Sequence, residues 1–330
     1  MKAESSEVMR MKEIDIYLIA GQSNASGHTK VRDAEAIYRQ YPELRAGYDH
    51  VHYAGNSRVD ADNFKALVNR DFPWCRTRLG LGIRHDGYMG PEAGMAAGLS
   101  AVYNKESGRH AGLIKFAHGG TGLLDNRVRS NLFGNWMPPS YAKLIGVPWE
   151  NEPITGVLYR LLLAQVEKDL RELRYYGDFD KVNIKGMYWM QGCHNRGVPQ
   201  EYRRAFPLFA ADVRRDLAAL LTGLYGEDCG AAEMPIVVGT ISRTFMIDGP
   251  GMIERVNVPF IEMQRSLPEV VPGCYVADNS EYAICAWDEA EGKVIPLGTD
   301  TAHWNQQDAL DIGIGVGKIF CDLAQGTCQD

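Results

Sequence analysis

Five short apolar runs alternate with segments of helical periodicity along this chain. The runs cover residues 14–20, 112–117, 182–190, 235–242 and 274–278, and continuous apolar runs of this length are typical of strands buried on both faces of a parallel sheet. Apolar residues recur at helical spacing in residues 90–103, 153–174, 200–221, 254–267 and 306–323. Alternating strands and helices predict an α/β fold, a three-layer α/β/α sandwich with a five-stranded parallel sheet.

Three segments between these elements lack a clear period and are expected to be long loops, near residues 28–89, 122–152 and 279–302. They are rich in Tyr, Trp, Gly, Asn and Asp, and long loops in a compact domain are usually functional. We therefore expect them to wall a substrate pocket. The predicted organisation is an N-terminal extension over residues 1–13 and a single domain over residues 14–330.

Composition and charge narrow the class of partner. The chain is 45% hydrophobic and 23% charged, as soluble globular proteins are, and its net charge is −7. No run of lysine or arginine is present, so neither nucleic acid nor an anionic membrane is an expected partner. The polar N-terminus has no apolar core before Ile14, which favours a cytoplasmic location and leaves export open.

Cysteine, histidine and glycine patterns suggest no cofactor. The seven cysteines form no C-x-x-C pair and are expected to be reduced thiols. No H-x-x-x-H spacing supports a metal site. Gly313, Gly315 and Gly317 lie inside a helical pattern with no strand before them, so they predict close packing of a helix on the sheet instead of a dinucleotide site.

Polar, chemically capable residues follow the predicted strands. In open α/β sheets, active sites lie at the carboxyl ends of the strands. Ser23, Gly119 with Gly120, and Gln191 follow the first three strands, whereas Asp300 and His303 precede the last helix. The sequence therefore predicts one site built from segments far apart in the chain.

Ser23 has the setting of a nucleophile. Gly21 permits a sharp bend after the strand, which would expose the serine hydroxyl at the sheet edge. A serine hydroxyl needs a neighbouring base, and Asp300 and His303 are three residues apart, so the carboxylate could orient the imidazole and leave its other nitrogen free. The alternatives are a helix N-cap for Ser23 and a solvated loop acid beside a half-buried histidine.

Two further blocks could stabilise a tetrahedral oxyanion. They are His118-Gly119-Gly120-Thr121 and Trp189-Met190-Gln191-Gly192. Backbone N–H groups of a glycine turn and of Ser23, together with a glutamine amide, are suitable donors. In isolation, each block could equally be a plain glycine turn or a polar cap at a strand end.

In chain order, these blocks resemble the SGNH (GDSL-like) hydrolase superfamily, and within it the sialate O-acetylesterase-like carbohydrate esterases (carbohydrate esterase family six and relatives). The resemblance runs from about Ile14 to Phe320 and rests on "IYLIAGQSNASG", "GPEAGMAAGL", "LIKFAHGGTGL", "MYWMQG" and "DTAHWNQQDALDIG". It implies a flavodoxin-like SGNH hydrolase fold and the removal of acetyl groups from sugars without a metal or organic cofactor.

The resemblance also implies roles for individual residues. Ser23 would be the nucleophile, His303 the general base and then acid, and Asp300 its orienter. The oxyanion donors would be the Ser23 backbone, the Gly119-Gly120 turn and the Gln191 side chain, with Asn24 supporting the serine turn. Further candidate pocket residues are Gln22, His118, Cys193, His194, Trp304 and, as a contact for a substrate carboxylate, Arg127.

One block departs from the family pattern W-x-Q-G-E-S-D. Here Cys193 and Asn195 stand where the family has a glutamate and an aspartate. The change removes negative charge near the histidine and leaves the substrate class open. Cys193 is interpreted as support for the site, with a reactive thiol as the alternative.

Three functional hypotheses follow. The first is an esterase that removes O-acetyl groups from a carbohydrate through an acyl-enzyme. Its substrate would be a small-molecule or oligosaccharide acetyl ester. The second, motivated by Cys193 and Asn195, is a glycan-binding protein that has lost the chemistry. The third is an esterase for lipid or other small esters. The sequence does not determine the oligomeric state.

Overall fold

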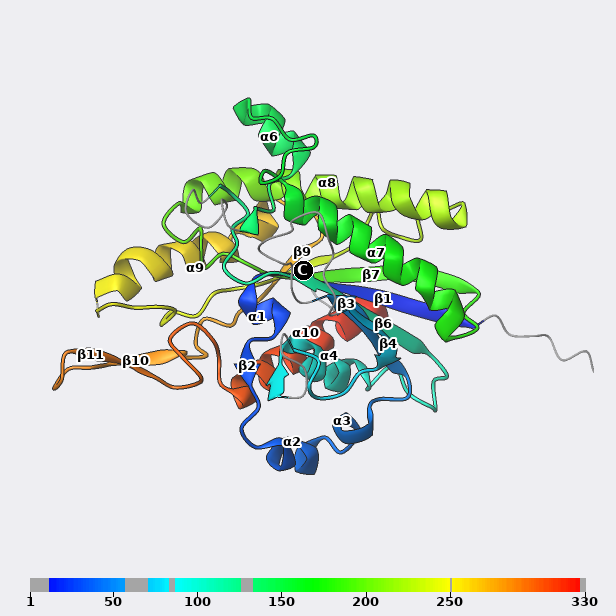
Figure 1. Cartoon of the computed structure of the whole chain (residues 1–330), viewed down its shortest axis with the longest axis horizontal. Coiled ribbons are helices and arrows are strands. Elements are labelled where there is room, and N and C mark those ends of the chain that lie inside the picture. Colours follow the sequence, from blue (N-terminus) through cyan, green and yellow to red (C-terminus); the bar gives the residue numbers. More distant parts are fainter. Residues whose placement is uncertain (1–11, 57–70, 83–86, 126–132, 250, 327–330) are drawn as a thin grey trace, which may run out of the picture.

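A seven-stranded sheet forms the centre of the computed structural model, which describes residues 12–56, 71–82, 87–125, 133–249 and 251–326 (Figure 1). The strand order is β4-β3-β6-β1-β7-β8-β9. All neighbouring strands are parallel except β3 and β4, which pair antiparallel. The bounds are β1 Glu13–Gly21, β3 Val51–Asn56, β4 Asp71–Arg76, β6 His110–Ala117, β7 Lys181–Met190, β8 Ile236–Gly239 and β9 Cys274–Ala277.

The five predicted strands are all present and adjacent, but the predicted count of five was wrong. The two additional strands, β3 and β4, lie in the segment 28–89 that was expected to be a loop. Their sequences, VHYAGN and DFPWCR, mix polar and apolar residues and carry no continuous apolar run. Pro73 cannot donate to a ladder, so β4 is suited to the sheet edge, where the structure places it.

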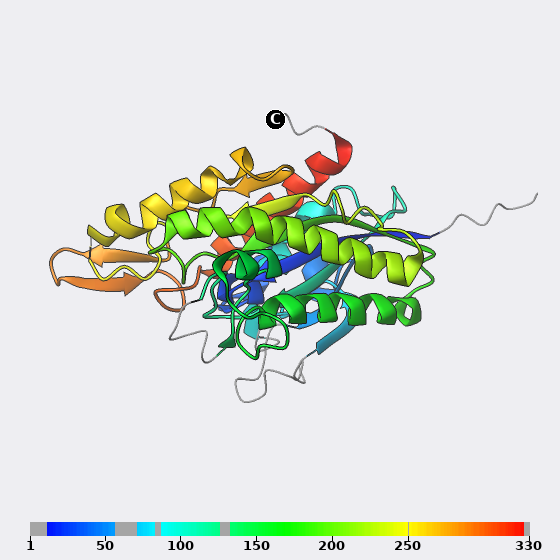
Figure 2. The same cartoon turned by 90° about the horizontal axis from the view of Figure 1, so that it is seen from above.

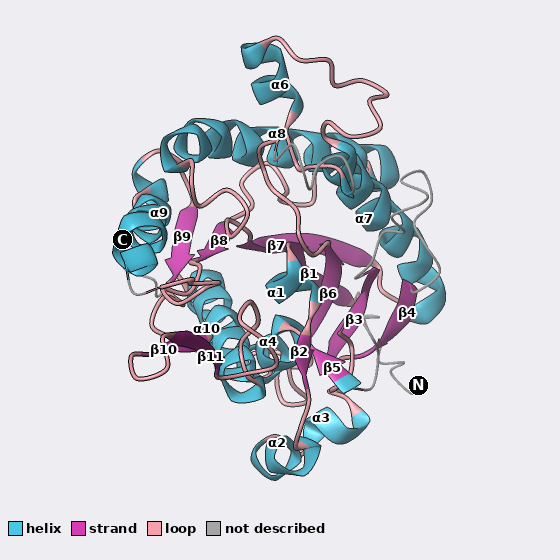
Figure 3. Ribbon diagram, turned by 60° about the vertical axis from the view of Figure 1, so that its left-hand side comes forward, coloured by secondary structure: helices cyan, strands magenta, loops and turns pink. Residues whose placement is uncertain are grey.

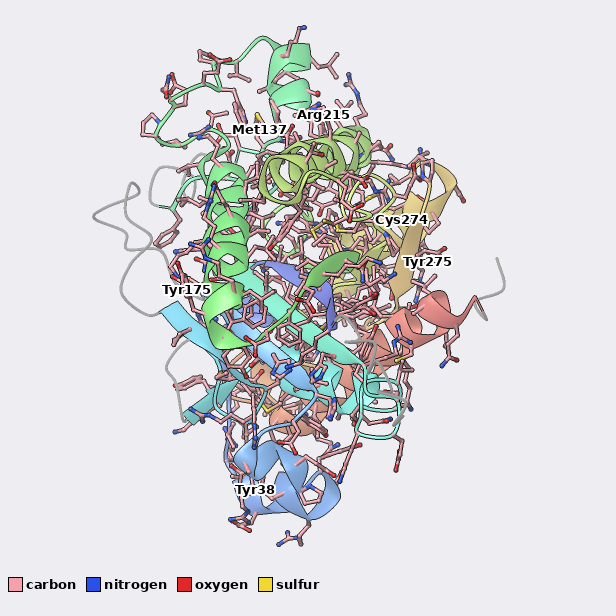
Figure 4. All side chains as sticks on the ribbon, turned by 90° about the vertical axis from the view of Figure 1, so that its right-hand side faces the viewer. Tyr38, Met137, Tyr175, Arg215, Cys274 and Tyr275 are labelled. Carbon is pink, nitrogen blue, oxygen red and sulfur yellow. The ribbon has the colours of Figure 1, made fainter. Side chains whose placement is uncertain are left out.

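Helices cover both faces of the sheet, which confirms the three-layer architecture. In Figures 1 and 3, α7 (Val157–Tyr176), α8 (Pro199–Tyr225) and α9 (Val258–Arg265) lie over one face, and α4 (Pro91–Leu99) and α10 (Gln306–Gln325) over the other. Figure 4 shows the sheet between the labelled Arg215 of α8 and Tyr38 of α2. None of the helices in the described residues combines the length and apolarity needed to cross a membrane.

The segments expected as loops also contain short elements. Residues 28–89 include β2 (Thr29–Lys30), α2 (Ala34–Gln40), α3 (Glu43–Ala46) and β5 (Tyr88–Met89). Residues 122–152 include α6 (Pro139–Ile145), and residues 279–302 include the hairpin β10 (Cys285–Asp288) and β11 (Lys293–Pro296). Figure 2 shows this hairpin projecting beyond the sheet. A π-helix at Ile253–Asn257 precedes α9, and a 3₁₀ turn at Leu267–Glu269 follows it.

Glycines bring α4 and α10 into close contact. A Cβ added to Gly94 of α4 would lie 2.1 Å from the Leu310 carbonyl oxygen, and one added to Gly313 would lie 2.3 Å from a carbonyl oxygen of α4. Gly317 makes a similar approach, whereas Gly315 faces open space. The sequence predicted that these glycines pack a helix on the sheet; the structure shows that they pack one helix on another.

Three histidines stack at the end of the sheet where strands β3 and β6 begin. The His110 ring lies 4.5 Å from the His50 ring and 5.3 Å from the His52 ring, between centroids. His52 Nε2 and His110 Nδ1 are 3.0 Å apart, and His52 Nδ1 is 2.9 Å from the Tyr176 hydroxyl. Burial, with the neighbouring positive groups, lowers the pKa of His52 to about 3 and that of His110 to about 4.

This cluster predicts loss of stability in acid. The unfolded chain takes up protons at His52 and His110 below an ordinary pKa of 6.5, while the folded protein does so only at about pH 3 and pH 4, respectively. The free energy of unfolding should therefore fall as the pH falls through this range. In His52→Gln, the loss between pH 7 and pH 5, measured by urea unfolding, should be smaller by about 2 kcal/mol. An equal loss in both proteins would contradict this account.

Candidate active site

Ser23 lies at the first turn of a short helix, α1 (Ser23–Ser26), directly after β1. The turn is tight because β1 ends against β7: Gly21 has φ +135°, and a Cβ there would lie 2.1 Å from the Met190 carbonyl oxygen. That carbonyl accepts a hydrogen bond from Gln22 N at 2.9 Å. The N-cap of α1 is Gln22, so Ser23 is not the helix cap that the alternative interpretation required.

Asp300 and His303 form a hydrogen-bonded pair in the loop before α10. His303 Nδ1 lies 2.8 Å from Asp300 Oδ2, while Asp300 Oδ1 accepts from the backbone N–H groups of Ala302 and His303 at 2.7 and 3.0 Å. Partial burial alone would raise the pKa of Asp300, but these hydrogen bonds outweigh it and lower the pKa below its ordinary value. The carboxylate is therefore ionised at neutral pH and holds the proton of His303 on Nδ1.

Hydrogen bonds join the serine segment to this loop across almost the whole chain. Asn24 Nδ2 donates to the Ala302 carbonyl at 3.2 Å, and Thr29 Oγ1 donates to the Trp304 carbonyl at 3.1 Å. On the other side, the N–H of Met246, in the segment after β8, donates to the carbonyl of Thr301 at 2.9 Å. These bonds hold the Asp300–His303 loop against the segment that contains Ser23, and the Asn24 side chain bonds to that loop and not to the serine turn.

The Gly119-Gly120 turn lies against the serine. A Cβ on Gly119 would be 3.2 Å from Ser23 Cβ, and His118 N donates to the Gly21 carbonyl at 3.0 Å. Gly120 has φ +78°, a left-handed conformation that favours glycine. The glycine turn that was predicted to supply oxyanion donors is therefore adjacent to Ser23, the predicted nucleophile. His118 is mostly buried there, with Nδ1 2.9 Å from the Gly119 carbonyl oxygen.

Gln191 lies beneath the site and not in its opening. Its side chain is fully buried, and Nε2 donates to the Thr121 carbonyl at 3.1 Å. Nε2 also lies 3.4 Å from both Gln22 Oε1 and Asn195 Oδ1. Gln191 therefore braces the turn after Gly120 in this structure, and the amide is not a free donor as the oxyanion role requires. Gln22 is likewise fully buried, so it does not line an open pocket.

The two residues that replace the family's acids, Cys193 and Asn195, are also buried. Asn195 Oδ1 accepts from Leu123 N at 2.7 Å and from Leu124 N at 3.3 Å, so the amide oxygen serves as an acceptor for backbone N–H groups. Burial raises the pKa of the Cys193 thiol to about 12. A protonated, buried thiol favours the supporting role over a reactive one. His194 between them is half-buried.

The remaining pocket candidates have different outcomes. Trp304 is buried, with 2% of its surface exposed, and its Nε1 donates to the Tyr282 carbonyl at 2.9 Å. Its indole therefore packs inside the protein, next in the chain to His303. Arg127 lies outside the described residues.

A buried ion pair supports the serine helix. Lys115 of β6 and Glu92 of α4 are both fully buried, and Lys115 Nζ lies 2.9 Å from Glu92 Oε2. Nζ also donates to the carbonyls of Leu81 at 3.0 Å and Ser26 at 3.4 Å, and Glu92 Oε1 accepts from Gly90 N at 2.8 Å. The ammonium therefore connects the sheet and α4 to the end of α1.

His28 belongs to the site although the sequence did not single it out. It follows α1, and its ring stacks on that of His303 with centroids 4.9 Å apart and an interplanar angle of 11°. Burial, with the proximity of His303, lowers its pKa to about 4. Its position five residues after Ser23 was visible in the sequence, but the stacking partner lies at the other end of the chain.

A metal site receives no support from the described residues. No group of three or more His, Cys, Asp or Glu side chains in the described part of the chain could hold a metal ion. Cys75, Cys193, Cys229, Cys274, Cys285 and Cys321 carry free thiols.

A three-layer α/β/α fold with a serine and an Asp–His pair at one sheet edge defines a class, the SGNH-type hydrolases. A family model described as "Carbohydrate esterase, sialic acid-specific acetylesterase" matches residues 13–271. The chain belongs to this family, whose members are hydrolases that act on ester bonds. None of the curated proteins matches the chain in sequence.

Two solved structures are similar over most of the chain. NanS is 12% identical, with a TM-score of 0.55, covering 97% of this chain and 100% of that one. A carbohydrate acetylesterase from Xanthomonas citri is 16% identical, with a TM-score of 0.55, covering 94% of this chain and 56% of that one. At these identities the two structures bear on the fold alone, and they agree with the architecture described above.

Removal of one partner of the buried ion pair should be costly. Lys115→Met leaves Glu92 buried without its cation, and we expect the free energy of unfolding, measured with urea, to fall by about 3–5 kcal/mol. The double variant Lys115→Met/Glu92→Leu should recover part of this loss, because no charge then stays buried. A loss below about 1 kcal/mol in the single variant would contradict the proposed support.

Proposed function

We propose that the protein is a serine esterase that removes O-acetyl groups from a carbohydrate through an acyl-enzyme. The observation that carries the proposal is the Asp300–His303 pair, fixed beside Ser23 by contacts between the two ends of the chain. Membership in a family of carbohydrate esterases supports the acetylated sugar as substrate class.

The geometry supports a definite assignment of proton positions. Since Asp300 accepts a hydrogen bond from Nδ1, the lone pair of His303 lies on Nε2. His303 Nε2 takes the proton of Ser23 as Oγ attacks the acetyl carbon, and backbone N–H groups of Ser23 and the Gly119-Gly120 turn stabilise the oxyanion. His303 then protonates the departing sugar oxygen. Water, deprotonated by the same nitrogen, hydrolyses the acetyl-serine to acetate.

The observations on Cys193 and Asn195 weaken the case for a non-catalytic glycan-binding protein. Asn195 fills a buried acceptor position facing two backbone N–H groups, which a neutral amide oxygen satisfies. Cys193 is buried and does not replace a member of the Ser–His–Asp set. A preference for acetyl over longer acyl esters separates this proposal from an esterase of lipid or other small esters.

Ser23→Ala should abolish the esterase activity. We expect the wild type to hydrolyse p-nitrophenyl acetate faster than the butyrate and octanoate esters, and to be inactivated by a serine-directed phosphonate. Preference for the longer acyl chains would favour an apolar pocket, since each extra buried CH₂ gains about 0.8 kcal/mol. Undiminished turnover by Ser23→Ala would overturn the serine mechanism, and sugar binding without any turnover would favour the binding protein.

Asp300→Asn should lower kcat by about 10³–10⁴-fold while the protein stays folded. The oxygen of the new amide is expected to keep the two backbone N–H bonds of Oδ1, so its NH₂ group faces Nδ1 and donates to it. The proton of His303 then lies on Nε2, where the base needs a lone pair. Steady-state kinetics on p-nitrophenyl acetate measures the effect, with the thermal unfolding midpoint as the control. A kcat within about threefold of the wild type would exclude Asp300 as the orienting acid.

A further inference from the structure

His28 lies between the parts of the site and contacts each of them. Its ring stacks on His303, and its Nδ1 is 3.1 Å from the Ser23 carbonyl oxygen. A Cβ on Gly119 would lie 3.0 Å from His28 Cε1, so the ring also packs on the glycine turn. The mechanism proposed above assigns no step to this residue.

The hydrogen bonds of His28 define its tautomer. A carbonyl oxygen can only accept, so Nδ1 carries the proton that it donates to Ser23 O. Ser26 Oγ, 3.0 Å from Nδ1, itself donates to the Ser23 carbonyl at 3.1 Å and can therefore share the Nδ1 proton as an acceptor. These contacts anchor the ring to the backbone of the nucleophile turn and prevent it from rotating freely.

From this geometry we propose that His28 is a positioning residue, whose stacked ring holds the imidazole of His303 in the orientation that Nε2 needs to take the proton of Ser23. The proposal rests on the proposed esterase function. A general base must lie within hydrogen-bond reach of the proton it removes, and a misplacement of about 1 Å can cost about 100-fold in rate. Asp300 holds His303 through one nitrogen, which leaves the ring able to swing about that bond. The stack restricts this swing.

The ring is also suited to this place because it is uncharged. Burial, together with the nearby His303 and His118, lowers the pKa of His28 to about 4. These effects outweigh the hydrogen bond to Ser23 and the charge of Asp300, both of which raise the pKa. Near neutral pH, His28 is therefore neutral when His303 takes the serine proton. The imidazolium then stacks on a neutral aromatic face instead of a second cation.

Two substitutions separate the ring from the hydrogen bond. His28→Phe keeps a stacking ring and loses the Nδ1 donor, whereas His28→Asn keeps an N–H donor near Ser23 O and loses the ring. If stacking positions His303, His28→Asn should lower kcat for p-nitrophenyl acetate by about 10–100-fold with KM within about twofold, and His28→Phe should stay within about threefold of wild-type kcat. The thermal unfolding midpoints show whether both variants are folded.

His50→Asn is a matched control remote from the site. His50 also stacks on another histidine, His110, with centroids 4.5 Å apart, and its Nδ1 lies 3.1 Å from a backbone carbonyl, that of Arg109. Loss of this ring should leave kcat unchanged. Wild-type kcat in His28→Asn, or an equal loss in His28→Phe and His28→Asn, would overturn the positioning role.

A second readout is independent of turnover. In protein labelled with ¹⁵N-histidine, the Nδ1–H proton that His303 shares with Asp300 should give a sharp NMR signal in the wild type and His28→Phe. The signal should broaden or vanish in His28→Asn, because the unstacked ring moves and exchanges its proton. An unchanged signal in His28→Asn would contradict the proposal even if no ester is hydrolysed, whereas inactivity of the wild type with the expected signals would count against the esterase function alone.

Discussion

The buried ion pair between Lys115 and Glu92 is the constraint on which the site depends. Burial lowers the pKa of Lys115, and the charge of Glu92 opposes this effect. Two unpaired charges could not stay in this interior, so β6, α4 and the end of α1 must meet at one point. This meeting places the helix that begins with Ser23 above the sheet, with the turn after β6 beside it. The ion pair thus fixes the Ser23 side of the candidate site from below, whereas the Asp300–His303 loop is held by hydrogen bonds from Asn24, Thr29 and Met246.

Close approaches between backbone segments also hold the parts of the site in position. Gly21 lets β1 end against the Met190 carbonyl, and the glycines of α4 and α10 let these helices touch without intervening side chains. Since α10 begins just after His303, its position on α4 also sets the position of His303, the proposed base. A rigid path therefore runs from the ion pair through α4 and α10 to the Asp300–His303 loop. Positional accuracy at the reacting atoms derives from these packed elements.

The site combines one anchored carboxylate with neutral neighbours. Asp300 receives three hydrogen bonds and stays ionised, while His28 is neutral and Cys193 and Asn195 carry no charge near neutral pH. An imidazolium formed on His303 then meets one negative partner and no competing acid at the Cys193 and Asn195 positions. The departures from the family pattern alter the buried support of the site and leave its reacting groups in place.

The sequence by itself determined the five buried strands, the five helices that cover the sheet and the block order that predicts Ser23, Asp300 and His303. These features are local, because continuous apolar runs and helical periods need no distant partner to be recognised. Tertiary structure decided the rest. β3 joins the sheet because β6 offers it an edge, and β4 then pairs with β3. The burial of Trp304 and Gln191 likewise depends on segments that reach them from elsewhere in the chain. His28 joins His303 across 275 residues only when the chain folds, since stacking requires proximity in space, which no spacing along the sequence encodes.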